Sequence, residues 1–467
     1  MAAISSKYKP YPEYKDSGVE WFGPIPAHWI VAGFKKYLSS IVDYRGKTPN
    51  KTESGMLLVT ARNIKQGKLQ YDKSQEFIDP DDYEAVMIRG KPELGDVLFT
   101  TEAPLGEVAT VDRTDFALAQ RIIKFSGMAG VLDNYYFKYL LMSEEFQQSL
   151  KMYASGSTAL GIKAERFVYL RKLLPPIDEQ HLITNFLDHE TAKIDTLIEE
   201  QKTLIRLLQE KRQAVISHVV TKGLNPDAPM KDSGVEWLGE VPEHWIVRRL
   251  KHVADLQSGI PKGKDLAGKI TIEVPMLRVA NVQDGYLKLN EVHKIHIEPD
   301  QLERYELKKG DVLMNEGGDN DKLGRGAVWK GEIAPCIHQN HVFAIRPKDI
   351  EPEWLALLTG SSYAKFHFYR VAKQSTNLAS ISSSNIKETP LVIPPFEERR
   401  AIIDHLKTLM KKYDAIEAQG QDQVRLLTER RTALISAAIT GKIDVRDWKP
   451  TAHPQQKHPE APHEQTA

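Results

Sequence analysis

The 467-residue chain contains a long internal duplication, and no other feature of the sequence restricts its fold as strongly. Residues 15–31 read KDSGVEWFGPIPAHWIV and residues 231–247 read KDSGVEWLGEVPEHWIV, with 13 of 17 positions identical at an offset of 216. Residues 206–223 and 425–442 repeat again, with 9 of 18 positions identical at an offset of 219. Offsets close to half the chain length indicate one large unit used twice, not a solenoid of short repeats.

The first repeated segment holds four of the seven tryptophans, namely Trp21, Trp29, Trp237 and Trp245. Tryptophan at fixed spacing with glycine and proline is typical of a packed turn that leads into a strand. We therefore interpret this repeat as structural and not as a reaction centre.

Two long helices are predicted after the double prolines that end at Pro176 and Pro395. Apolar residues recur there at steps of three, four and seven, which marks a stripe along one helix face. Acidic residues follow each proline pair, and Gly223 and Gly441 lie just past the patterns, as helix starts and stops require. Each stripe needs an apolar partner, so we expect the two helices to pair as an antiparallel coiled coil. Their charged outer faces are interpreted as solvated, with docking of partner subunits as the alternative.

The remaining sequence forms two regions of domain size, residues 32–172 and 248–389. Short runs such as 56–60, 96–100, 276–280, 311–314 and 341–345 predict strands, and helices are expected near 135–151 and 353–369. Short motifs recur in order, for example Gly-Asp-Val-Leu at 95–98 and at 310–313. The fold class is therefore α+β, with two related recognition modules whose loops carry specificity.

Composition excludes several classes of protein. A single cysteine, Cys336, rules out a disulfide scaffold and cysteine-rich zinc sites. No apolar run reaches the length of a transmembrane helix, and the first residues lack the apolar core of a signal peptide, so we expect a cytoplasmic protein. The residues after 446 are rich in proline and polar side chains and are expected to be a disordered tail over 447–467; its histidines do not have metal-ligand spacing.

Motifs for catalysis are missing from the sequence. Walker A, Gly-x-Ser-x-Gly, His-Glu-x-x-His and the adenine-methylating Asn/Asp-Pro-Pro-Tyr/Phe patterns do not occur. Asp300, Glu306 and Lys308 fit the loose spelling of a metal-dependent nuclease, in which two carboxylates would hold Mg²⁺. The better interpretation of Asp300 is a helix start, and the first copy has no matching Glu-x-Lys. We expect no catalytic residues and no metal site.

Polar and basic residues in turn-rich loops are the candidate DNA contacts. Arginine and asparagine pair bidentately with guanine and adenine, while lysine, serine and threonine suit phosphates. Their recurrence at matched places in both copies favours the loops as a group. The candidates are Arg45, Lys47, Thr48, Lys51, Arg62, Asn63, Gln120, Arg121, Ser157 and Thr158 in the first copy, and Lys262, Lys264, Arg278, Asn281, Gln339, Asn340, Ser375, Thr376 and Asn377 in the second.

The duplicated KDSGVEWxGxxPxHW segments, the paired Pro-Pro-acidic starts and the repeated helix ends closely resemble the specificity subunit of type I restriction–modification systems. The resemblance covers nearly the whole chain except the tail. It implies target recognition domains over 1–172 and 228–390, with spacer helices over 173–227 and 391–446. Each domain would read one half of a split DNA site in the major groove, and the two helices would set the unread spacer.

The resemblance also implies partners. The chain itself would do no chemistry and hold no cofactor. It would recruit two modification subunits, which methylate adenine with S-adenosylmethionine, and restriction subunits that translocate DNA with ATP and Mg²⁺.

Two other functions stay open on the sequence alone, a self-sufficient Mg²⁺-dependent endonuclease and a coiled-coil scaffold without a DNA role. The charge balance of 63 basic against 63 acidic residues argues against a protein that coats DNA through a general basic field. It is compatible with a protein whose important cations lie in local loops, and whose own affinity for non-target DNA is weak.

Overall fold

The computed structural model describes residues 8–46, 48–156, 159–261, 266–318, 323–374 and 379–450. Contacts divide the chain into two compact units: unit 1 comprises residues 1–201 and 422–467, and unit 2 comprises residues 202–421. Each dividing point falls inside a long helix, so each helix contributes one part to each unit. The expected domains, with the helices as separate segments, stay a prediction.

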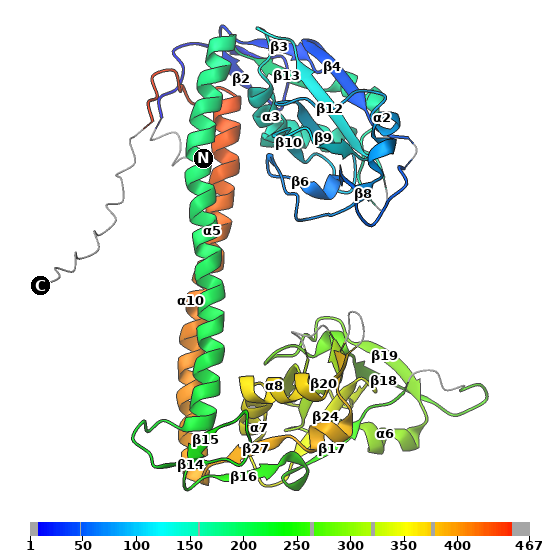
Figure 1. The fold of residues 1–467 in the computed structure, drawn as a ribbon, viewed down its shortest axis with the longest axis vertical. Helices are drawn as coiled ribbons and strands as arrows, with labels where there is room; N and C mark the ends of the chain where they lie inside the picture. The colour runs from blue at the N-terminus through cyan, green and yellow to red at the C-terminus, as the bar shows by residue number, and fades with distance from the viewer. Residues whose placement is uncertain are drawn as a thin grey trace, which may run out of the picture. The chain divides into compact units, whose positions relative to one another are not determined.

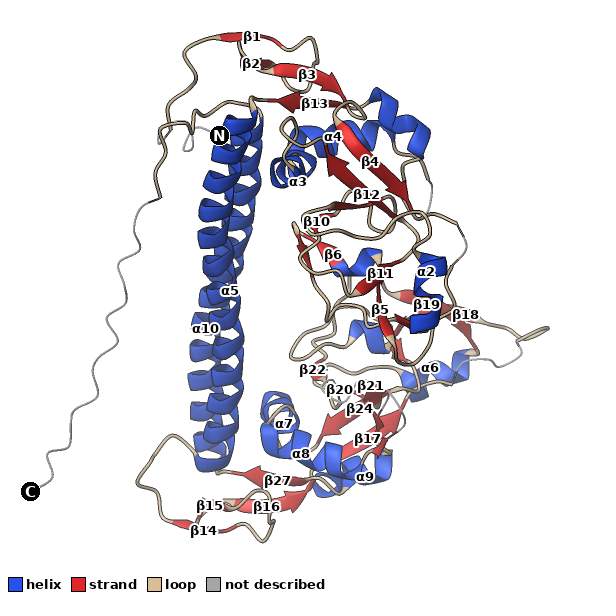
Figure 2. Ribbon diagram, turned by 45° about the horizontal axis from the view of Figure 1, so that its top comes forward, coloured by secondary structure: helices blue, strands red, loops and turns tan. Residues whose placement is uncertain are grey.

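The two long helices are α5 (Ile177–Lys222) and α10 (Phe396–Ile439), and within each unit they lie side by side (Figures 1 and 2). In unit 1, Arg431 of α10 pairs with Asp195 of α5 at 2.6 Å. In unit 2 the roles are exchanged, because Arg212 of α5 pairs with Asp414 of α10 at 2.6 Å. The predicted antiparallel helix pair is confirmed within each unit.

The duplicated tryptophan segment anchors each unit to the first turn of a long helix. In unit 1, Glu179 of α5 accepts hydrogen bonds from Trp29 Nε1 at 2.9 Å and Tyr11 Oη at 2.5 Å, and His28 Nε2 lies 2.7 Å away. In unit 2, Glu398 of α10 holds Trp245 and His244 in the same way. Both Trp29 and Trp245 are fully buried, so the structural interpretation of this repeat is confirmed.

Unit 1 is built on a four-stranded sheet in the order β10-β9-β12-β4, next to a three-stranded sheet in the order β11-β5-β8. A core of phenylalanines, including Phe34, Phe99 and Phe125, joins the first sheet to the helices. The elements of unit 1 besides the long helices are β1 (Tyr14–Asp16), β2 (Pro24–Pro26), β3 (Ile30–Gly33), β4 (Leu38–Asp43), β5 (Met56–Val59), β6 (Ile64–Lys65), β7 (Lys68–Leu69), β8 (Phe77–Ile78), α2 (Tyr83–Val86), β9 (Val97–Thr100), β10 (Val108–Thr110), β11 (Phe116–Leu118), β12 (Ile122–Gly127), α3 (Asn134–Met142), α4 (Glu144–Tyr153) and β13 (Arg171–Leu174).

Unit 2 repeats this plan with the sheets β17-β24-β20-β22 and β19-β18-β23. In both units the second sheet contains one parallel pair, β11 with β5 and β18 with β23. The elements of unit 2 are β14 (Met230–Asp232), β15 (Glu240–Pro242), β16 (Ile246–Arg249), β17 (Ala254–Ser258), β18 (Ile272–Leu277), β19 (His293–Ile297), α6 (Pro299–Tyr305), β20 (Val312–Asn315), β21 (Gly317–Gly318), β22 (Gly326–Val328), β23 (Ile337–His338), β24 (Val342–Pro347), α7 (Pro352–Thr359), α8 (Ser362–Val371), β25 (Lys373–Gln374), β26 (Ala379–Ser380), α9 (Ser383–Lys387) and β27 (Pro390–Ile393).

The repeated Gly-Asp-Val-Leu motif places one buried carboxylate at the start of a central strand in each unit. Asp96 lies 2.6 Å from Lys124 Nζ, and both side chains are almost fully buried. Asp311 accepts two hydrogen bonds of 2.7 Å from Arg346. A buried charge is tolerated only when it is paired, so this motif serves the fold.

Three details differ from the sequence-based expectations. The helix expected near 135–151 is two helices, α3 and α4, and the one near 353–369 is also two, α7 and α8. The chain just after residue 446 is packed, because the Trp448 ring lies 5.4 Å from that of Phe186 on α5. The rest of the expected disordered tail, from 451, lies outside the described residues.

Among the described residues, no helix is both long enough and apolar enough to span a membrane.

Candidate nucleic-acid interface

Arg45 lies in the loop after β4 and connects two loops of unit 1. Its Nε donates to Asp43 Oδ1 and Oδ2 at 2.9 and 3.0 Å, and its Nη1 donates to the carbonyl of Ile162 at 3.2 Å. Although burial opposes it, hydrogen bonding from Arg45 holds the pKa of Asp43 below its ordinary value. About a third of the Arg45 side chain is exposed, so the guanidinium can exchange a carboxylate for another anion.

Arg121 lies beside the same loops. It is exposed, has a φ of 76°, and its Nε is 2.7 Å from Glu102 Oε1. Thr101 donates to the Arg121 carbonyl at 2.9 Å and accepts from Ile162 N at 3.0 Å. The structure therefore brings Arg45 and Arg121 to one group of loops.

Thr48 and Gln120 line one pocket of unit 1, together with Gly46 and Arg89. Lys51 follows Thr48 by three residues and is exposed, and its Nζ lies 2.7 Å from Glu76 Oε2. We name this group the unit 1 loop cluster, consisting of residues 43–46, 48–51, 101–106, 119–121 and 159–162.

The corresponding loops of unit 2 are joined by the same kind of backbone contacts. Asn340 N donates to the Ile260 carbonyl at 3.0 Å, and Glu316 N donates to the His341 carbonyl at 3.0 Å. Gln339 and Asn340 are half-buried there. We name residues 259–261, 316–318, 338–341 and 379–381 the unit 2 loop cluster.

Asn63 and Asn281 are corrected from candidate base contacts to structural residues. Both are buried at the ends of matching 3-10 turns, Ala61–Asn63 and Val279–Asn281. The Asn63 amide donates to Gln70 O at 3.0 Å and Ser74 O at 2.9 Å, and its Oδ1 accepts from Thr60 N at 2.9 Å. Asn281 makes the equivalent bonds. An amide whose groups are all engaged in the core cannot reach a base edge.

Arg62 and Arg278, which precede these asparagines in the chain, are held by fewer hydrogen bonds. Arg62 is exposed on the turn. Arg278 is half-buried, and its Nε is buried without a hydrogen-bond partner among the described residues. The remaining candidates lie outside the described residues: Lys47, Ser157, Thr158, Lys262, Lys264, Ser375, Thr376 and Asn377.

The sequence did not indicate Glu102, which pairs with the candidate Arg121, or Glu316, which lies next to His341. It also did not indicate His341 and Arg89. Arg89 Nη1 donates to the Asp43 carbonyl at 2.7 Å and to that of Arg45, so it fixes the Arg45 loop. The only signal for His341 is its place next to Asn340. The carboxylates carry no signal of their own, because their partners are distant in sequence.

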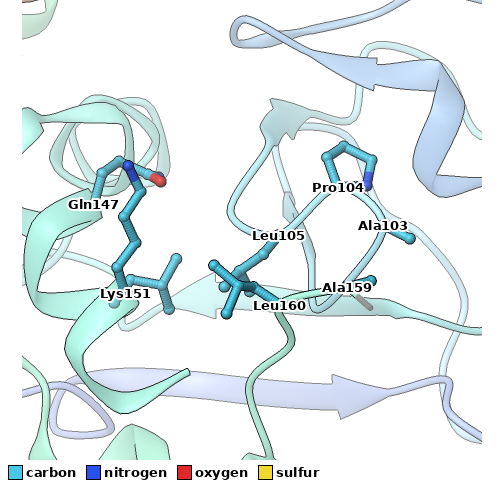
Figure 3. A pocket seen from close by; sticks show the side chains of 8 residues that line it. Ala103, Pro104, Leu105, Gln147, Lys151, Ala159 and Leu160 are labelled. Atoms are coloured by element: carbon cyan, nitrogen blue, oxygen red, sulfur yellow. The ribbon is translucent and has the colours of Figure 1, made fainter. Parts of the chain in front are cut away.

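A shallow pocket of about 290 Å³ adjoins the unit 1 loop cluster (Figure 3). Leu105 and Leu160 lie together on one side of it, and Gln147 and Lys151 of α4 lie on the other. Its lining is mainly apolar and offers no constellation for catalysis.

The nuclease-like residues of unit 2 are engaged in local structure. Asp300 lies in the first turn of α6, as the helix-start interpretation predicts, and Lys308 forms an ion pair with Glu306. Within the part of the chain that the structure describes, no three histidine, cysteine or acidic side chains gather where they could hold a metal ion.

Comparisons with known proteins place these observations in a family. The model described as type I restriction modification DNA specificity domain matches residues 38–206 and 242–426. The type I restriction enzyme EcoKI specificity subunit of Escherichia coli (strain K12) is 21% identical over 446 residues, which cover 91% of both chains. The StySPI specificity subunit of Salmonella potsdam is 20% identical over 447 residues, again with 91% of both chains covered.

A solved chain from work on complex assembly and conformational transition of the type I R-M system has the same fold. It superposes with a TM-score of 0.63 at 16% identity, covering 89% of this chain and 98% of that chain.

Proposed function

The chain belongs to the type I restriction–modification DNA specificity family, and on that premise we propose that its two loop clusters read the two halves of a split DNA target. The chain is a non-catalytic DNA sequence-specificity subunit, and it works with DNA and with modification and restriction subunits. The DNA contacts that we propose are Arg45, Thr48, Lys51, Gln120 and Arg121 in the unit 1 loop cluster, and Gln339 and Asn340 in the unit 2 loop cluster. Arg62 and Arg278, at the 3-10 turns outside these clusters, are two further proposed contacts.

One observation carries the assignment: in both units, candidate side chains lie on the segment that connects the small sheet to the large sheet. Gln120 and Arg121 follow β11 and precede β12, while Gln339 and Asn340 follow β23 and precede β24. In both units this segment leads from the small sheet to the central strand of the large sheet. Side chains that combine base-edge hydrogen bonding with positive charge at such a place suit direct readout in the major groove.

The partners complete the function. We propose that two modification subunits bind this chain and supply S-adenosylmethionine chemistry at adenine, and that restriction subunits supply ATP-driven translocation and Mg²⁺-dependent cleavage. The chain then acts where the genome lies, which in a prokaryotic cell is the cytoplasm. The lack of a general positive charge supports this division of labour, because partners can provide the additional phosphate contacts.

The test is an exchange of one recognition region. Residues 32–172 are replaced by the corresponding region of a relative with a different target, in cells that contain the modification subunits. We expect one half of the methylated target to change and the other half to stay. The matched control exchanges residues 248–389 and should change only the opposite half. A target that is unchanged after both exchanges would contradict the proposal.

A further inference from the structure

Each loop cluster contains a glutamate whose side chain lies next to that of a basic residue, which is Arg121 in unit 1 and His341 in unit 2. In unit 1, Glu102 Oε1 lies 2.7 Å from Arg121 Nε. In unit 2, Glu316 Oε2 lies 2.6 Å from His341 Nδ1. Neither pair lies within one of the segments that are similar in sequence, so the recurrence is visible only in three dimensions.

Backbone hydrogen bonds show that the two pairs occupy equivalent places. In unit 1, Thr101 N donates to the Arg121 carbonyl and Ile162 N donates to the Thr101 carbonyl, at 2.9 and 3.0 Å. In unit 2, Glu316 N donates to the His341 carbonyl and Ile381 N donates to the Glu316 carbonyl, at 3.0 and 2.9 Å. Arg121 and His341 therefore correspond, and the carboxylate comes from the residue at, or directly after, the same position.

The exposure of these pairs suits an exchange of partners. Arg121 and Glu102 are 48% and 43% exposed, and His341 and Glu316 are 55% and 29% exposed. Exposed ion pairs contribute little to folding. A carboxylate beside the cation also cancels its attraction for phosphate, and it repels a DNA backbone that comes close.

The same arrangement recurs at other candidate contacts of unit 1. Arg45 is paired with Asp43, and Lys51 is paired with Glu76. The unit 1 loop cluster thus carries its cations in neutralised form, which fits a chain with no net charge.

We propose that Glu102 and Glu316 are specificity-determining residues that keep the neighbouring basic side chain, Arg121 or His341, from phosphates of non-target DNA. This side chain changes partner only where a target half-site offers a base edge or a backbone position that replaces the carboxylate. This inference rests on the proposed function, because it requires that the loop clusters face DNA.

The test compares binding of target and non-target duplexes by the full chain in complex with its modification subunits, over a series of salt concentrations. Glu102→Gln keeps the shape of the side chain and removes its charge. We expect non-target affinity to rise roughly threefold to tenfold, with the slope of log K against log salt steeper by about 0.9, as one additional phosphate contact requires. Target affinity should change less, so discrimination between the duplexes falls. Glu316→Gln should act in the same direction.

Three further variants, Glu388→Gln, Arg121→Gln and Arg45→Gln, separate the possible failures. Glu388→Gln removes a carboxylate that pairs with Arg249 and Lys251 beside β27, outside the loop clusters, and should leave both affinities and the slope unchanged. Arg121→Gln should weaken target binding.

Suppose that Arg121→Gln weakens target binding while Glu102→Gln and Glu316→Gln bind like the unaltered chain. The proposed role of the carboxylates is then wrong, but the proposed DNA interface stands. If Glu102→Gln weakens target binding, Glu102 reads the DNA directly and the inference is overturned. If Arg121→Gln and Arg45→Gln both leave target binding unchanged, the assigned interface itself is wrong.

Discussion

A buried lysine in unit 1 makes the stability of the protein depend on pH. Lys172 of β13 is fully buried, and its Nζ donates to the Phe34 carbonyl at 3.0 Å. Burial lowers its pKa from 10.5 to about 7. The matching position of unit 2, counted from the double proline, is Leu391, which is also fully buried. An aliphatic side chain therefore fits the duplicated fold at this place.

The sign of the effect follows from proton binding. Between pH 7 and 10.5 the unfolded chain carries a proton on Lys172 that the folded chain lacks, so this group makes stability rise with pH. The slope is at most about 1.4 kcal/mol per pH unit. We expect Lys172→Leu to flatten the profile of thermal unfolding between pH 6 and 9 and to raise stability at the lower end.

The matched control is Lys124→Leu, because Lys124 is equally buried but is paired with Asp96. Removing Lys124 leaves a buried carboxylate without its partner, which costs about 3–5 kcal/mol. A loss of stability for Lys172→Leu comparable to that of Lys124→Leu would contradict the account of Lys172 as an unpaired buried amine.

The role of a residue could be predicted from the sequence where local packing determines its burial, and could not be predicted where tertiary contacts determine it. The tryptophan repeat was interpreted correctly, because glycine, proline and tryptophan in fixed order describe local packing. Asn63 was misassigned, because an asparagine suited to a base edge is equally suited to hold a turn from within. Only the tertiary position of the Gln70 and Ser74 carbonyls distinguishes the two roles.

At the scale of elements, the two long helices end in glycines whose surroundings differ. Gly441 follows α10 with a φ of +69°, and a Cβ there would lie 2.4 Å from the ring of Pro26. Gly223 follows α5 with a φ of +79°, and its Cβ would meet nothing closer than 3.3 Å.

Alanine at either position costs about 1–2 kcal/mol for the left-handed backbone. Gly441→Ala should cost a further 1–3 kcal/mol, roughly, because a rigid ring cannot move aside as a side-chain end can. Unfolding in urea measures the difference. Equal losses for Gly441→Ala and Gly223→Ala would contradict the predicted clash.

Helix existence was predictable from apolar periodicity, but interruptions within helices were not. Ser143 ends α3 and its side chain caps α4, so a stretch that looks continuous in sequence is two helices. The same holds where Gly360 and Ser361 separate α7 from α8. A serine can stand inside a helix as well as cap one, so periodicity alone cannot locate such breaks.

For the whole molecule, the long helices are the elements that both units share, because each unit holds one part of each helix. We therefore predict that the helices set the distance between the two half-sites. Inserting seven residues after Gln201 and seven after Gln421 lengthens the pair by about 10 Å at 1.5 Å per residue. That length corresponds to roughly three base pairs at 3.4 Å each.

The measurement is the spacing of the methylated target in cells that contain the lengthened chain, and it should grow while both half-site sequences stay the same. A seven-residue insertion after Trp448, outside the helices, is the control and should leave the spacing unchanged. A lengthened helix pair with the original spacing would contradict the role of the helices.

If this chain chooses the DNA sequence that its partners modify, the pattern of methylated adenines across the genome must depend on it. We expect one split target to be methylated in cells that contain the chain, and methylation at this target to disappear in cells that lack it. The same methylation pattern in both cells would show that the chain does not choose the target.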